Sequence, residues 1–414
     1  MTHTAKLVCF FTLLACSNAS FSGGPLVIQG AGGNTPVRYA NPAITLHTEN
    51  GDLGTLTNTQ ADDLIQEVVT LWNDITTSTI VLTVDTTMIA DDIDATSANA
   101  IIQNNTDNLN PIIYDTDGTI IDDFFGIGAS DDIAGFAASF FSVGGDFFSE
   151  GFAVINGKNV TNADVDLKLT IAHEIGHFIG LDHSQVNINN QENLSNFPLI
   201  CFSTSASNYP LMYPFVCRDI VSLHLDDAMS LSSLYPSVDI NNNLGILQGN
   251  LVNLTGDAIL GANVFVTNNT TGETVSIVSD YLRQQTGFYK LYLPADNYTL
   301  HANSINTLFN GGSSIGPYAN SILDTSFITP HPITETIYQD MATGNDAVIT
   351  IATNQTLAFD FALDVGTNEE DNAGGSTDNK KSSSSKILGA PSFLTLFILL
   401  GLIKTTRRLY FSAL

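Results

Sequence analysis

The chain has 414 residues, and its 42 Asp and Glu against 13 Lys and Arg give a formal net charge of −29. A surface this acidic repels nucleic acid and anionic membrane surfaces, so we exclude both as binding partners. It suits solubility in a salty extracellular medium, where salt screens the self-repulsion, and it would attract calcium ions. The length is sufficient for two modest domains with targeting segments.

The N-terminus has the layout of a secretory signal peptide. A lysine precedes an apolar run over residues 7–15, and small polar residues follow it. Cleavage at those small residues would remove residues 1–19 and export the protein. The run before Cys16 also resembles a bacterial lipobox, which would place a lipid on Cys16. Because Leu14 stands where a small or β-branched residue is usual, we favour ordinary cleavage.

The first folded unit is expected over residues 25–238, where strand and helix patterns are mixed. Strands are expected at residues 37–47 and 80–84, and helices at residues 62–75, 166–181 and 226–234. This order of strands and helices indicates an α/β or α+β catalytic domain.

The motif that carries the chemistry lies around the second of these helices. His173 and His177 are four residues apart, so on a helix their imidazoles share one face and can bind one metal ion. Gly180 can adopt the left-handed conformation that ends a helix, which would bring His183 back as a third ligand. Three imidazoles with an open fourth position are typical of a catalytic zinc site. Glu174 would then be the catalytic base that takes a proton from the attacking water.

These residues match the metzincin signature, His-Glu-x-x-His-x-x-Gly-x-x-His followed by a Met-turn. The chain resembles the matrixin branch of that family, in which the methionine, here Met212, lies beneath the zinc site. Ser184 after the third histidine is similar to that branch, and Pro214 stands where astacins and serralysins carry a zinc-binding tyrosine. The resemblance implies a zinc-dependent endopeptidase with a central sheet, an active-site helix and a cleft along the sheet edge. We therefore favour an α+β catalytic domain with a mixed sheet.

Two cysteines follow the signal region, Cys201 and Cys217. In an exported chain such a pair indicates one disulfide, with two free thiols as the alternative. The pair flanks the Met-turn, so the bond would tie down the specificity pocket that the resemblance places between His183 and Met212. Animal matrixins are kept latent by a propeptide cysteine on the zinc. No such cysteine precedes the site here after the signal, so we do not expect latency by that route.

An acidic stretch before residue 124 resembles the start of a calcium loop, because its carboxylates alternate and Gly118 permits a sharp turn. The candidate calcium ligands are Asp115, Asp117 and Asp122. The later bidentate glutamate of a full EF-hand is missing, so an acidic turn exposed to solvent is the favoured alternative to structural calcium.

The second folded unit is expected over residues 243–364 as a small all-β sandwich domain. Short alternating runs, separated by Gly, Asn and Asp, occur at residues 262–266, 275–278, 289–293 and 298–302. Its glycine pattern resembles the carboxypeptidase-regulatory or transthyretin-like sandwiches that are appended to secreted enzymes. It carries no catalytic constellation, and a plain spacer is its default role.

The C-terminus resembles an anchor. Residues 365–386 form a polar Ser/Gly-rich linker, residues 387–403 are apolar, and residues 404–414 are a basic tail. This order predicts a short membrane segment with its positive tail in the cytoplasm. It also resembles bacterial sorting tails that are cut during surface display.

The function predicted from the sequence is therefore a secreted or cell-surface zinc metalloendopeptidase, a monomer that cuts extracellular proteins or peptides. A surface adhesin with a vestigial protease fold is the alternative from another class. The intact ligands, glutamate and Met-turn count against it. A zinc hydrolase of a non-peptide bond is the third hypothesis, because the metal chemistry does not choose its substrate.

Overall fold

The computed structural model of the protein describes residues 24–28, 34–142, 144–186, 208–304, 333–340 and 343–364, with strands at 407–409 and 412–413. The predicted signal peptide with Cys16, the polar linker and the apolar segment at residues 387–403 lie outside these residues. Within the described part of the chain, no helix is long and apolar enough to cross a membrane.

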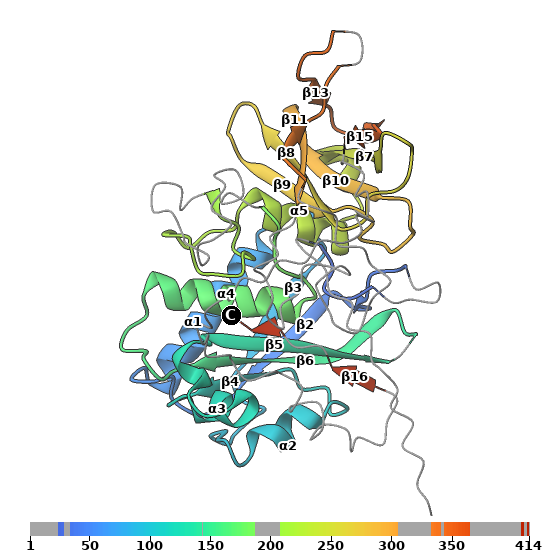
Figure 1. Cartoon of the computed structure of the whole chain (residues 1–414). Coiled ribbons are helices and arrows are strands. Elements are labelled where there is room, and N and C mark those ends of the chain that lie inside the picture. The colour runs from blue at the N-terminus through green and yellow to red at the C-terminus, as the bar shows by residue number, and fades with distance from the viewer. Residues whose placement is uncertain are drawn as a thin grey trace, which may run out of the picture.

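The first unit is built on a twisted sheet (Figure 1). Its strands are β1 (Arg38–Tyr39), β2 (Ala43–Thr48), β3 (Val81–Asp85), β4 (Pro111–Asp115), β5 (Gly135–Ser142) and β6 (Phe147–Asn156). The order across the sheet is β5-β6-β4-β2-β3, and β1 pairs with the start of β6. All pairs are parallel except β5 with β6, so β5 is the antiparallel strand beyond β6.

Helices cover both faces of this sheet (Figure 1). One face carries α1 (Asn58–Asn73) and α4 (Val165–Phe178), and the other carries α2 (Ala98–Gln103), α3 (Thr119–Phe125) and the short 3-10 helix η1 (Ala129–Asp131). Strand β5 is buried on both sides because its residues alternate between two cores. Phe141 packs with α1 and α4, whereas Phe136 packs with α2 and α3.

The predicted elements of this unit are confirmed, with shifted boundaries. Helix α1 begins four residues earlier than predicted, because Thr57 and Gln60 form a capping box before the first apolar residue. The single strand expected over residues 37–47 is split into β1 and β2. Pro42 stands in the gap and has no N–H to donate to a ladder. The mixed helix and strand composition is therefore as expected.

A helix, α5 (Leu225–Leu234), and the short α6 (Ile240–Asn243) lead into a second unit made of strands, here called the β unit. One of its sheets contains β7 (Leu244–Asn253), β10 (Phe288–Pro294), β14 (Thr356–Ala358) and β15 (Phe361–Leu363). The other contains β8 (Ala262–Asn268), β9 (Thr274–Val278), β11 (Asp296–Ser304), β12 (Thr336–Ile337) and β13 (Val348–Ile351). A separate apolar core fills this unit, with Leu247, Val264 and Leu300 among its fully buried residues.

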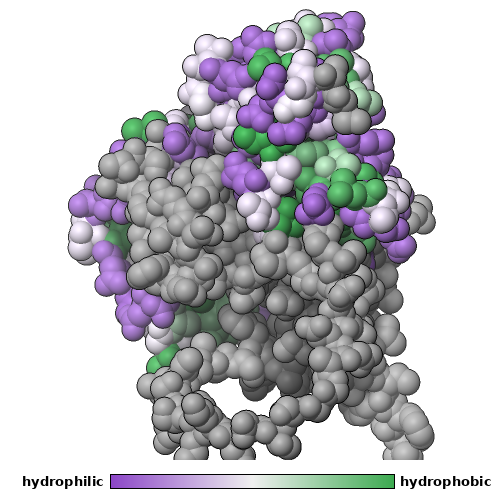
Figure 2. Space-filling view, turned by 45° about the horizontal axis from the view of Figure 1, so that its top comes forward, coloured by the Kyte–Doolittle hydropathy of each residue, from purple (hydrophilic) through white to green (hydrophobic). Residues whose placement is uncertain are grey.

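Helix α5 belongs to both units. Leu231 and Leu234 are buried in the core of the first unit, whereas Met229 is buried in the core of the β unit. Apolar surface gathers where the two units meet, and the outer face of the β unit is mostly hydrophilic (Figure 2). The β unit is therefore packed onto the first unit.

The basic tail contributes two short strands, β16 (Arg407–Leu409) and β17 (Ser412–Ala413). Both pair antiparallel with β5, on the side away from β6. This edge of the sheet thus accepts an added antiparallel strand.

Candidate metal centre

Three histidines converge at the C-terminal end of α4. His173 and His177 lie on one face of this helix, one turn apart. Gly180 follows with a φ of +95°, the left-handed conformation that the sequence predicted, and Leu181 N–H closes the turn on the carbonyl of Gly176 at 2.9 Å. The chain then turns back and brings His183 to the other two imidazoles.

The ring nitrogens of the triad are oriented for one ion. The Nε2 atom of His183 lies 2.9 Å from Nε2 of His173 and 3.0 Å from Nε2 of His177. On the far side of the rings, His173 Nδ1 lies 2.8 Å from the carbonyl oxygen of Leu211, and His177 Nδ1 lies 2.8 Å from that of Leu181. A carbonyl accepts the proton on Nδ1 and leaves the Nε2 lone pair free for a metal ion. The group can therefore bind a metal ion.

Burial keeps these imidazoles neutral, which is the form that binds metal. All three are at most 1% exposed. Desolvation lowers the pKa of His173 to about 4, against the opposing effect of its bond to the Leu211 carbonyl. The pKa values of His177 and His183 lie well below the usual range, first because of burial and then because of the neighbouring imidazoles.

Glu174 directly follows His173 in α4, is fully buried, and packs over the backbone of Gly135, the first residue of β5. A Cβ atom on Gly135 would come within 2.9 Å of the Glu174 Cγ atom, so glycine provides the room for this side chain. Both carboxylate oxygens are buried and have no hydrogen-bond partner in the described residues. Burial raises the pKa of this carboxyl well above its usual range. When it is ionised, a carboxylate with a raised pKa and unused oxygens is a strong proton acceptor, which suits a residue that directly follows the ligand His173.

Met212 lies beneath the helix that carries the triad. It is 1% exposed, and its carbonyl accepts the Ser184 N–H at 2.7 Å. Asp227 holds the turn from below, because its carboxylate accepts the N–H groups of Leu211 at 2.8 Å and Met212 at 2.9 Å. The sequence pointed to Met212 as part of the site, whereas Asp227 entered only as part of a run at residues 225–227 that resembles the matrixin branch, with no role given to it.

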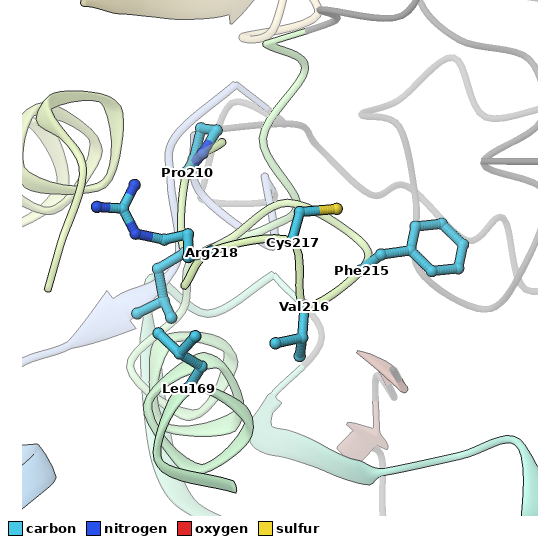
Figure 3. Close-up of a pocket in the computed structure, with 7 residues that line it drawn as sticks. Leu169, Pro210, Phe215, Val216, Cys217 and Arg218 are labelled. Carbon is cyan, nitrogen blue, oxygen red and sulfur yellow. The ribbon is translucent and has the colours of Figure 1, made fainter. Parts of the chain in front are cut away.

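A small pocket that is partly open to solvent lies beside the Met-turn (Figure 3). Leu169, one turn before His173, rises from α4 towards Val216, and the guanidinium of Arg218 extends on the other side. The remaining lining residues are Pro210, Leu211, Phe215 and Cys217. The predicted specificity segment before Met212 supplies only two of these residues. Residues 187–207 of that segment lie outside the described part of the chain.

The three candidate calcium ligands are not brought together into a metal-binding group. Asp115 accepts the N–H groups of Ile120 and Ile121 at the start of α3, at 3.1 and 2.8 Å. Asp117 accepts the N–H and hydroxyl of Thr119, and Asp122 accepts the N–H of Ser130. In the described residues these carboxylates accept hydrogen bonds from local backbone, and Asp115 is buried, which differs from the expected turn exposed to solvent.

Cys217 is disulfide-bonded. Cys201 lies outside the described residues, so its pairing with Cys217 stays a prediction. Cys217 lines the pocket beside the Met-turn. Its disulfide would therefore stabilise that wall of the pocket.

No model of a known protein family matches this chain, and no curated protein matches it. Among solved structures, the Bacillus anthracis TIE protein matches at 14% identity over 30% of this chain, with a TM-score of 0.17. The chain covers 17% of that protein's length. A likeness this limited carries no argument about fold or activity, so the proposals below depend on the site itself.

Proposed function

We propose that the chain is an exported zinc-dependent endopeptidase of the matrixin-like metzincin kind. The observation that carries the proposal is the convergence of three buried Nε2 atoms, with the buried carboxyl of Glu174 directly after the first ligand in α4. Three neutral imidazoles suit zinc, and His173, His177 and His183 would hold it. When bound, zinc supplies a Lewis acid that polarises the scissile carbonyl and activates water.

The chain's own residues would supply the proton transfers and the positioning. Glu174 would take a proton from the attacking water and return it to the nitrogen of the departing amine, a role favoured by its burial and by its free oxygens. The carbonyls of Leu211 and Leu181 hold the His173 and His177 rings in one tautomer and orientation.

The pocket beside the Met-turn would receive the side chain that follows the scissile bond. Leu169 and Val216 give it apolar walls, and Leu169 lies one helical turn from the ligand His173. We therefore expect a small apolar side chain as the preferred occupant, because the walls are apolar and the pocket is small. The antiparallel strand β5 starts at Gly135 against Glu174, so a peptide added to this edge would pass the base.

We also infer that the β unit is a sandwich of the carboxypeptidase-regulatory or transthyretin-like kind, a hypothesis that its two sheets around one core support. Export is supported by the disulfide at Cys217, because such bonds persist in oxidising compartments. Anchoring through residues 387–403 stays a prediction. It places the basic tail in the cytoplasm, so in an anchored, exported chain the tail would not pair with β5.

The test is a zinc measurement together with cleavage of a quenched peptide library by the parent, Glu174→Gln and Asp166→Asn. Asp166 is an exposed acid in the first turn of the same helix and serves as the matched control. We expect one bound zinc in all three proteins and a loss of about 10²–10⁴-fold in cleavage for Glu174→Gln alone. Zinc bound by an equally inert parent and variant would favour the adhesin or a hydrolase of another bond.

The assay should use both the full chain and a chain that ends at Lys386. In the full chain, β16 and β17 lie along the β5 edge where a peptide would bind. If the tail blocks this edge, the full chain would be inactive and the shortened chain active. The comparison therefore distinguishes a blocked edge from an inactive site.

A further inference from the structure

A buried carboxylate joins the β unit to the metal centre. Asp226, near the start of α5, is 1% exposed. Its Oδ2 atom accepts the hydroxyl of Ser184 at 2.5 Å. Its Oδ1 atom accepts the backbone N–H of Ser276 at 2.6 Å and the Ser276 hydroxyl at 3.3 Å. Ser276 belongs to β9 of the β unit and is 50 positions from Asp226 in the sequence. The Asp226 side chain therefore joins the β unit to Ser184 of the first unit.

Ser184 is the link to the triad, because it directly follows His183. Its backbone N–H donates to the carbonyl of Met212 at 2.7 Å, and its hydroxyl is held by Asp226. The backbone and the side chain of Ser184 are thus both held by hydrogen bonds. His183 is the ligand that lies beyond the helix, so its position depends on these contacts more than the helical ligands do.

The β unit supplies the other half of the contact. Ser276 pairs with Phe265 in the middle of the β8–β9 ladder, and α5 packs on β9 and β10 with Met229 in their core. A carboxyl group is costly to bury unless its oxygens are hydrogen-bonded. Displacing β9 would leave Oδ1 of Asp226 without its donors and loosen the support of Ser184.

We propose that Asp226 is a positioning residue through which the β unit holds His183 in place for metal binding. The proposal rests on the zinc site proposed above. It gives the β unit a role in the site that a spacer would not have. Because coupling between two sites is reciprocal, zinc binding must in turn order β9.

The experiment measures this reciprocal effect without any peptide substrate. Amide hydrogen exchange of the full chain is followed with zinc and with a chelator, and zinc affinity is measured by competition with a chelating dye. We expect zinc to slow exchange of the β9 amides, including that of Ser276. Ser184→Ala should lose most of this zinc-dependent protection and bind zinc about tenfold more weakly, at the lower end of the effect of residues that support metal ligands.

Two further variants separate this role from general destabilisation. Ser233→Ala changes an exposed serine of α5 and should leave both measurements unchanged. Asp226→Asn should also weaken zinc binding, and its effect should not add to that of Ser184→Ala, because both remove the same contact. Additive effects would overturn the proposal.

Exchange of β9 that does not respond to zinc, or unchanged zinc affinity in Ser184→Ala, would also overturn the coupling. Such a result in a chain that still cleaves peptides would leave the proposed function intact. Zinc-dependent protection of β9 in a chain that cleaves no peptide would support the coupling and count against the proposed peptidase function. A chain that binds no zinc would overturn both.

Discussion

Gly176 lies directly against the sulfur of Met212. A Cβ atom at Gly176 would overlap Met212 Sδ, and it would approach Met212 Cε and Trp72 Cζ2 to 3.0 Å each. The glycine between the two helical ligands therefore allows the Met-turn to pack under α4. The Leu211 carbonyl of the same turn binds His173 Nδ1, so this packing also positions a ligand.

Gly176→Ala should therefore destabilise the protein, although alanine favours a helix over glycine by about 0.5–1 kcal/mol. Overpacking a full core costs about 1–3 kcal/mol, which outweighs the helix preference. We expect a net loss in urea unfolding and weaker zinc binding. Gly176→Ala combined with Met212→Ala should recover part of both, since the shorter side chain makes room. A single variant as stable as the parent would contradict the packing argument.

Removing the metal should lower the melting temperature of the protein. A ligand that binds only the folded state stabilises it by about 4 kcal/mol at a concentration 1,000 times its Kd. We expect a chelator to lower the melting temperature by several degrees and zinc to restore it. In His183→Ala the chelator should have almost no effect, because the third ligand is gone. An equal chelator effect in this variant would place the stabilising ion elsewhere.

The sequence was sufficient for the parts of the site that depend on local geometry. The spacing of His173 and His177 and the left-handed Gly180 are properties of a few neighbouring residues, and the structure has them as expected. Helices α1, α4 and α5 and strands β1–β3 and β8–β11 were also found, because each has its own apolar periodicity. Helices α2 and α3 and the strands β4–β7 were not predicted.

Contacts between distant segments were not found from the sequence. The room that Gly135 gives to Glu174 and the bond between Asp226 and Ser276 join residues whose order in the chain has no local pattern. The pocket was placed before Met212, whereas Val216 and Arg218 after it supply part of the lining. Predicting these contacts requires knowing how α4 packs against the loop at residues 210–218, and the periodicity of apolar residues does not contain this information.

Val216 should control which side chain the pocket accepts. It points towards Leu169 across the pocket (Figure 3), so Val216→Ala would deepen the space between them. We expect the ratio of kcat/KM for a larger against a smaller apolar side chain after the scissile bond to rise by about 10-fold or more. One methylene in an apolar pocket changes selectivity by roughly 10–200-fold. Val238→Ala, at an almost fully exposed valine, is the control, and an unchanged ratio in Val216→Ala would exclude this pocket as the specificity site.

His224 should make the protein less stable in acid. Its Nδ1 atom accepts the N–H of Asp226 at 3.1 Å and so caps α5, which only the neutral ring can do. Burial, and then the charge of Arg218, lowers the pKa of His224 to about 3. An unfolded chain binds this proton below about pH 6.5. The folded state does not, so stability falls as pH decreases from about 6.5 towards 3, by at most about 1.4 kcal/mol per pH unit.

His224→Asn isolates this contribution, because asparagine is a good N-cap that does not titrate. Urea unfolding of both proteins in chelator at pH 7 and pH 5 removes the effect of zinc loss from the comparison. The triad histidines titrate equally in both proteins, so their contribution cancels in the difference. We expect the parent to lose about 2 kcal/mol more than His224→Asn between these pH values. Equal losses would mean that the pKa of His224 is not lower in the folded protein than in the unfolded chain. The cap on α5, and with it the position of Asp226, would then not depend on a neutral ring.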